Sequence, residues 1–278
     1  MDRKLSAKTD KPDKSTVDVR WDSRKLKAED SIVWRAGHTS IWVQRTERDW
    51  IVAGDTDKNE SPSFLFEKAK SLPIDVEWRR WAGLGGSSIV RFQPAFPNRP
   101  LVVKTRAPIM VPPSKTIELF INIPVWVEVF VDTGLEPTSL GVFPTRTLSN
   151  TWFGTQYEGE LCFALKSLAR RVKDDLTIEA LAATCLFSIT NHSKEALPLD
   201  RIRVLPQHLS VYKSRRRLWT SPIKVVSYGP DEPSQLYYPT EPHESGRSVV
   251  ELVRPPEKIY RPSFFRESFA HYTRALFE

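Results

Sequence analysis

The sequence predicts a mainly β protein, built as an antiparallel β-sandwich or as two packed β subdomains, with an amphipathic helix at the C-terminal end. Short runs of β-branched and aromatic residues alternate with polar residues along most of the chain, which is the period of a strand with one buried face. The 278 residues include 22 prolines, and these interrupt stretches that would otherwise suit long helices. Strands and long helices do not alternate, so the pattern does not favour a parallel α/β fold.

The N-terminal part of the sequence divides into a tail and a first β domain. Residues 1–17 carry four lysines and almost no apolar side chains, which predicts a disordered basic tail. Residues 18–140 are expected to form the β domain. Its strands are expected at 31–33, 40–44, 50–53, 76–82, 88–93, 101–106, 116–123 and 125–131. Turn-like segments at 36–38 and 46–49 separate the first three strands, and a short helix is expected over 64–72.

The most regular alternation lies on either side of Pro124. Isoleucine, leucine and valine occupy every second position over 117–123 and again over 125–131. Two runs with a period of two and many β-branched residues indicate strands. Pro124 has no backbone N–H to donate, so it predicts a bend, a bulge or an edge position. Glu118 and Glu128 alternate with the aliphatic face, and we expect both to point to solvent.

A rise in glycine, proline, serine and threonine over 133–150 marks the expected start of a second unit, a β-sandwich over 141–255. Its strands are expected at 140–143, 151–153, 184–190, 202–205, 209–212, 218–220, 223–228 and 248–253. The strands on either side of 213–217 are expected to form a hairpin with a basic turn. Residues 160–172 fit both a helix face and a strand, and the neighbouring strands favour a strand.

The last segment, 256–278, is expected to be an amphipathic helix. Pro262 suits the first turn of a helix. Four large apolar residues follow at positions i, i+4, i+7 and i+11, which places them on one helix face: Phe265, Phe269, Tyr272 and Leu276. This face suits either docking on the protein's own β domain or packing on a partner protein.

Several classes of protein are disfavoured by composition. No run of 18 apolar residues is present, so we expect no transmembrane segment. The first residues lack the apolar stretch of a secretory signal, which predicts a cytoplasmic protein. The two cysteines, Cys162 and Cys185, lie in apolar surroundings and are expected to be inert core residues. The five histidines show no metal-ligand spacing, so we expect neither a metal nor a cofactor, and we assign no catalytic residue.

The basic residues give the candidate binding positions. The chain has 41 Lys and Arg against 34 Asp and Glu, a modest excess that suits either plain solubility or an anionic partner. Two clusters lie beside aromatic residues, and these clusters are Lys213, Arg215, Arg216 and Arg217, and Arg79 and Arg80. Arginines between aromatic rings are compatible with a solvated hairpin tip, a protein or lipid contact, or nucleic acid. A glycine-rich segment over 83–88 lacks the lysine of a phosphate loop, and we expect a hairpin turn or an anion-binding nest there.

Part of the chain resembles a known family. The most specific elements are TWFG at 151–154 and EGEL at 158–161, within a similarity that covers residues 34–226. The sequence resembles an uncharacterised prokaryotic family, one of the domains of unknown function. Members of that family are often encoded beside small mechanosensitive-type channels. The resemblance therefore implies an accessory role at the cytoplasmic side of the inner membrane, with a channel as one possible partner.

Three functional hypotheses follow. The first is a non-enzymatic interaction protein of the cytoplasm that binds another protein, such as the cytosolic part of a membrane channel. The alternative is a carbohydrate-binding or carbohydrate-active β protein, because nine tryptophans on a β scaffold could line a sugar groove. The third is nucleic-acid binding through the basic hairpin, which we consider unlikely because no complete nucleic-acid motif is present.

Overall fold

The computed structural model describes residues 21–134, 136–154, 157, 159–165, 169–214, 217–229, 234–242 and 251–261, with the backbone alone described at 57–63, 106–107, 174 and 200. Within these residues the chain is mainly β, as predicted, and its strands form four sheets. Two short 3₁₀ helices, η1 (Lys173–Asp175) and η2 (Pro206–His208), are also present. The described residues contain no helix that is long and apolar enough to cross a membrane.

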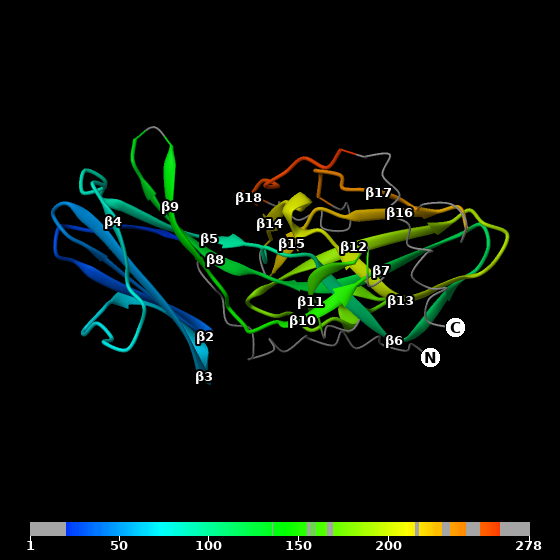
Figure 1. Ribbon diagram of the computed structural model, residues 1–278, viewed down its shortest axis with the longest axis horizontal. Helices are drawn as coiled ribbons and strands as arrows, with labels where there is room; N and C mark the ends of the chain where they lie inside the picture. The colour runs from blue at the N-terminus through cyan, green and yellow to red at the C-terminus, as the bar shows by residue number, and fades with distance from the viewer. Residues whose placement is uncertain are drawn as a thin grey trace, which may run out of the picture.

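Two of the sheets lie at one end of the molecule (Figure 1). The first sheet has the order β1-β5-β8-β9 and consists of β1 (Ser23–Lys25), β5 (Ile89–Ala95), β8 (Trp126–Asp132) and β9 (Pro137–Phe143). The second has the order β2-β3-β4 and consists of β2 (Ser31–Arg45), β3 (Asp49–Lys68) and β4 (Arg79–Ala82). Both sheets contribute to one hydrophobic core, which we call the small core. Trp34 of β2 stacks there on Phe92 of β5, with 6.1 Å between the ring centroids.

The other two sheets form the larger end. The third has the order β10-β11-β6-β13 and consists of β10 (Ser149–Phe153), β11 (Glu160–Leu165), β6 (Leu101–Val111) and β13 (Leu197–Val204). The fourth consists of β7 (Lys115–Pro124), β12 (Ala182–Asn191), β14 (Val211–Lys213), β15 (Leu218–Thr220), β16 (Ile223–Ser227), β17 (Gln235–Tyr237) and β18 (Glu251–Arg254). Residues of both sheets, such as Ile202 of β13 and Phe187 of β12, share the large core.

The chain passes from one core to the other at Pro124, the last residue of β7. β7 pairs with β12 along its whole length, whereas β8 pairs with β5 and β9 in the first sheet. The interruption predicted at Pro124 is therefore a change of sheet. Residues of β6 and β7 pack in the large core, whereas residues of β8 and β9 pack in the small core. Neither core is therefore formed by one continuous part of the sequence. The division into domains at residues 140 and 141 stays a prediction.

Three strand pairs depart from the antiparallel pattern that the sequence predicts. β11 runs parallel to β6, and β12 runs parallel to both β15 and β16. These pairs join strands that are distant in sequence, so their direction is set by long connections and not by tight turns. A half-buried strand shows the same alternation of apolar residues whether it pairs parallel or antiparallel. The sequence pattern therefore did not reveal the three parallel pairs.

Two local predictions in the N-terminal part are wrong. The turn expected at 36–38 is an irregularity inside the continuous strand β2, where the pairing with β3 shifts on both sides of Gly37. Gly37 has a φ of 57°, a left-handed conformation that glycine adopts without strain. The helix expected over 64–72 is instead the end of β3, which pairs with β2 from Leu65 to Lys68. Pairing with a long neighbouring strand overrides the weak helical tendency of this short segment.

The later predictions have mixed outcomes. Residues 160–165 form β11, so the preference for a strand is confirmed there, and Arg170 makes an isolated bridge with Phe120. The hairpin around 213–217 is confirmed, since β14 and β15 are antiparallel. Val211 pairs with Thr220 at one end of the hairpin, and Lys213 pairs with Leu218 at the other. The C-terminal helix is not seen: residues 256–261 are not helical. Residues 262–278, with Phe265, Phe269, Tyr272 and Leu276, lie outside the described residues, as does the tail over 1–17.

Candidate binding cleft

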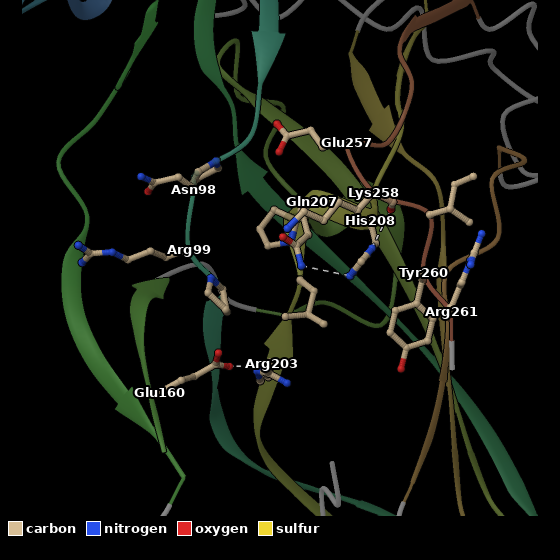
Figure 2. Close-up of a pocket in the computed structure, with 15 residues that line it drawn as sticks. Asn98, Arg99, Glu160, Arg203, Gln207, His208, Glu257, Lys258, Tyr260 and Arg261 are labelled. Atoms are coloured by element: carbon tan, nitrogen blue, oxygen red, sulfur yellow. Dashed lines mark hydrogen bonds and ion pairs between the residues drawn. The ribbon is translucent and has the colours of Figure 1, made fainter. Parts of the chain in front are cut away.

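A cleft of about 720 Å³ opens in the large end of the molecule (Figure 2). Its walls come from three segments that are far apart in the sequence. They are the connection between β5 and β6 at 97–100, the end of β13 with η2 at 203–208, and the segment 257–261 that follows β18. Glu160, the first residue of β11, completes the lining. The sheets thus bring together residues that no local motif connects.

Hydrogen bonds to η2 hold the segment after β18 in place. The Lys258 backbone N–H donates to the Gln207 carbonyl oxygen over 3.0 Å. Nδ1 of His208 lies 2.8 Å from the Lys258 carbonyl oxygen. Because a carbonyl oxygen only accepts, Nδ1 carries the hydrogen in this contact. The other ring nitrogen, Nε2, lies 3.2 Å from Nε2 of Gln207, which can donate to it. Both sides of the imidazole therefore have partners within the wall.

An aromatic cluster stiffens the same wall. The His208 ring lies 5.3 Å from the Tyr238 ring and 5.1 Å from the Tyr260 ring, and the two tyrosine rings are 4.9 Å apart. Tyr238 is buried, and its hydroxyl oxygen accepts the Leu205 backbone N–H over 3.3 Å. Burial raises the pKa of Tyr238, so its hydroxyl stays neutral. This side of the cleft is accordingly a packed surface.

Basic side chains outnumber acidic ones in the cleft. Its two carboxylates are already paired with arginines, Glu160 with Arg203 and Glu257 with Arg254, the latter over 3.2 Å. Three other lining side chains have no carboxylate at ion-pair distance in the described part of the chain, and they are Arg99, Lys258 and Arg261. The cleft therefore presents a net positive charge that its own carboxylates do not neutralise.

Arg99 is positioned from the β10–β11 side of the cleft. Its Nη1 donates to Oδ1 of Asn150 over 3.2 Å, and its guanidinium lies 5.2 Å from the centroid of the Phe163 ring. An arginine over an aromatic face keeps its charge while losing part of its freedom of motion. Lys258 and Arg261 are exposed on the opposite wall. Figure 2 shows the Arg99 side chain pointing away from Lys258 and Arg261, which lie on the other side of the cleft.

Of the basic residues that the sequence predicts as anion-binding candidates, those that the structure describes do not line this cleft. Arg80 pairs with the buried Asp49, whose Oδ2 accepts its Nε–H over 2.6 Å, and Arg79 is exposed beside it on β4. Lys213 is exposed at the end of β14. The guanidinium of Arg217 lies 5.4 Å from the Trp219 ring centroid. Arg215 and Arg216 lie outside the described residues, so the binding role of both clusters stays a prediction.

The glycine-rich segment over 83–88 is not a hairpin turn. It joins β4 to β5, which lie in different sheets. The Gly83 backbone N–H donates to Oδ1 of Asp49 over 3.2 Å, and that of Gly85 donates to the Arg48 carbonyl oxygen over 2.9 Å. These two amides are therefore satisfied within the protein, which removes them from an anion-binding nest.

Sequence reasoning also misjudged one carboxylate. Glu128 is only 7% exposed, although its position on β8 predicts a solvent-facing side chain. Oε2 of Glu128 pairs with Nη1 of Arg254 over 2.6 Å, and Oε1 accepts the Ser139 hydroxyl over 2.7 Å. The side chain of Arg254, on β18, reaches the face of β8 that the alternation assigns to solvent. Glu118 is exposed, as predicted.

The tryptophans are divided between core and surface. Trp34, Trp42, Trp50 and Trp126 are buried. Trp81 on β4 and Trp152 on β10 are exposed, but they lie in different sheets and do not form one aromatic platform. Among the described residues no three His, Cys, Asp or Glu side chains are grouped closely enough to hold a metal ion.

Comparisons with known proteins place the chain in a family. A search of curated proteins and a search of solved structures gave no match. A family model described as "Protein of unknown function (DUF432)" matches residues 20–274, which is most of the sequence. The match includes the segment 34–226 on which the resemblance to an uncharacterised family rested. The chain therefore belongs to the DUF432 family of proteins of unknown function.

Proposed function

We propose that the protein is a non-enzymatic interaction protein that binds an acidic segment of another protein in the cleft. The observation that carries this proposal is the charge arrangement. Both carboxylates of the cleft are paired with arginines, while Arg99, Lys258 and Arg261 remain available to an incoming anion. A carboxylate that enters would gain charge-assisted hydrogen bonds without displacing an existing ion pair.

The shape of the site favours a polypeptide segment over larger anionic surfaces. The cleft is concave and bounded by chain on at least two sides, so a flat bilayer would not reach its floor. The aromatic rings of the wall pack on one another, with His208 and Tyr238 tilted together, and do not offer a row of open faces to successive bases. A narrow acidic chain suits both features.

We infer the partner protein and the cellular compartment from the family resemblance. We infer a cytoplasmic protein whose partner is the cytosolic part of a mechanosensitive-type channel, and we infer that each pair of sheets forms a β-sandwich around its core. Co-purification of the tagged full-length protein with such a channel from native membranes in mild detergent tests the partner. Recovery of the channel in equal amounts with the charge variant described next would contradict binding through the cleft.

The charge variant carries Arg99→Gln, Lys258→Gln and Arg261→Gln. We expect this protein to bind a labelled peptide of alternating aspartate and glycine about tenfold more weakly than the unchanged protein, measured by fluorescence anisotropy. A matched control removes three exposed lysines outside the cleft, with Lys70→Gln, Lys115→Gln and Lys224→Gln, and lowers the net charge equally. The control should bind within twofold of the unchanged protein. Equal weakening in both variants, or tighter binding of a single-stranded oligonucleotide than of the peptide, would refute the proposal.

A further inference from the structure

An exposed loop that carries both acidic and apolar side chains joins β3 to β4. A hydrogen bond closes this loop, because the indole N–H of Trp78 donates to the Pro73 carbonyl oxygen over 3.1 Å. We call the segment from Pro73 to Trp78 the acidic loop. Within it, Ile74 is 93% exposed, and Asp75 and Glu77 are exposed as well. The acidic loop thus presents an isoleucine and two carboxylates on a segment of defined shape.

The protein does not use these side chains internally. Asp75 and Glu77 have no cation at ion-pair distance within the part of the chain that the structure describes. Arg80, which follows shortly after the loop, is already paired with Asp49. An isoleucine that is almost wholly in water gains free energy when another surface covers it. The loop is therefore suited to a partner surface that is both basic and apolar.

The wall of the cleft that follows β18 has this composition. Lys258 and Arg261 are exposed cations in the cleft lining. Ile259 lies between them in the sequence, lines the same cleft and is 75% exposed. The hydrogen bond from the Lys258 backbone N–H to the Gln207 carbonyl oxygen holds this segment in place. The wall thus offers an isoleucine and two charges, as the acidic loop does, but the charges have the opposite sign.

We propose that the acidic loop of one copy of this protein binds in the cleft of a second copy. The inference rests on the proposed function, because both need a cleft that accepts an acidic segment, and it adds the chain itself as one source of that segment. The two carboxylates of the loop form charge-assisted hydrogen bonds with Lys258 and Arg261. Ile74 and Ile259 remove apolar surface from water against each other.

The positions of the two surfaces make this a contact between copies. The acidic loop lies between β3 and β4, in the end that holds the small core, whereas the cleft opens in the large end (Figure 1). A contact between different surfaces leaves the cleft of the first copy and the loop of the second unused, so further copies can add. A contact made by one loop buries little area, which predicts weak association that depends on protein concentration.

Charge reversal tests the contact in the full-length protein. The loop variant carries Asp75→Lys and Glu77→Lys, and the cleft variant carries Lys258→Glu and Arg261→Glu. We expect each variant alone to associate about tenfold more weakly than the unchanged protein, because like charges then face each other. An equal mixture of the two should restore association, since each reversed surface meets one of opposite charge. Sedimentation velocity over a wide range of protein concentration measures all three samples.

Two further comparisons separate local contact from general effects. Glu136→Lys with Glu195→Lys changes the net charge as the loop variant does, at exposed positions outside the loop and the cleft lining. This control should associate within about twofold of the unchanged protein. Ile74→Ser should weaken association about fivefold, because only the apolar contact is lost. Met110→Ser is its control, since Met110 is 55% exposed on β6, and it should leave association unchanged.

The outcomes distinguish this contact from the proposed function. A protein that stays monomeric at every concentration, yet binds the aspartate–glycine peptide, would overturn the contact between copies and leave the acidic cleft in place. Self-association that the loop and cleft variants weaken no more than their control would also overturn it. Failure of both self-association and peptide binding would overturn both proposals. If both are correct, the peptide should dissociate the assembled protein, because the two compete for one cleft.

Discussion

Gly85 lies against the backbone of the turn between β2 and β3. A Cβ atom at this position would be 2.1 Å from the Glu47 carbonyl oxygen and 2.7 Å from Cα of Arg48, and backbone cannot move aside as a flexible side chain can. The Gly85 carbonyl oxygen also accepts a hydrogen bond from Nη2 of Arg45 over 2.7 Å. Glycine is therefore required at position 85 because the neighbouring backbone leaves no room for a Cβ atom.

Replacing this glycine should be costly. We expect Gly85→Ala to lower the free energy of unfolding by about 2–3 kcal/mol, because the added methyl forces the loop away from the turn. Gly86→Ala is the control, since nothing lies within 4 Å of its Cβ position, and it should change stability by less than about 0.5 kcal/mol. Urea unfolding followed by tryptophan fluorescence measures both. Similar values for the two variants would show that the loop is not packed as described.

Composition and local pattern predicted which side chains are buried better than they predicted which residues those side chains contact. The cysteines are buried, as expected, and burial raises the pKa of Cys185 to about 12 and that of Cys162 to about 11. Glu128 has the same alternating position as Glu118, and only the packing of β18 makes it a buried ion-pair partner. A long-range contact of this kind leaves no mark on the neighbouring residues in the sequence.

At the scale of elements, Asp49 connects β3 to β4 and to the loop that follows. Its carboxylate accepts hydrogen bonds from Arg80 of β4 and from the Gly83 backbone N–H. These interactions, with the hydrogen bond from Arg80 first, hold the pKa of Asp49 below its usual value of 3.8. The ionised form is therefore favoured in the folded protein.

This lowered pKa predicts how the contribution of Asp49 depends on pH. The stabilisation is fully present above about pH 4, near the pKa of the unfolded chain, and it is lost as the pH falls through the folded pKa. We expect Asp49→Asn to be less stable than the unchanged protein at neutral pH, by an amount that shrinks as the pH falls below about 4. Urea midpoints at neutral and acidic pH measure this difference. A difference that stays constant over the range would contradict the assignment.

Elements with a regular period of two were predictable, and those shaped by distant pairing were not. The bounds of β7 and β8 match the two aliphatic runs that the sequence shows on either side of Pro124. The segment 64–68 was misjudged because its assignment depends on β2, and the break at Gly37 was misjudged because a bulge and a turn use the same residues. The cleft has no local signal at all, since its walls come from 97–100, 203–208 and 257–261.

At the scale of the whole molecule, one buried ion pair joins the first sheet to the fourth. Glu128 belongs to β8 and Arg254 to β18, and their side chains are 10% and 14% exposed. Nη1 of Arg254 also lies 3.4 Å from the Pro94 carbonyl oxygen of β5. The pair therefore fixes the two ends of the molecule to each other beside the segment that carries Lys258 and Arg261.

Breaking this pair should destabilise the molecule. We expect Arg254→Met to lower the free energy of unfolding by about 3 kcal/mol, because it leaves the Glu128 carboxylate buried without its charged partner. Lys68→Met is the control, since Lys68 is 75% exposed in its pair with Asp30 and should contribute less than about 1 kcal/mol. Denaturant titration gives both values. Equal costs would show that the Glu128 pair is as solvated as a surface pair.

The alternation of the chain between two cores has a consequence for its biosynthesis. β6 and β7 emerge from the ribosome early, but their partners β12 and β13 begin only at Ala182 and Leu197. At about 10 residues per second, translation takes several seconds to supply those partners. Meanwhile the aliphatic stripe from Ile117 to Ile123 has no sheet to cover it, which makes the nascent chain prone to aggregation until its second half arrives.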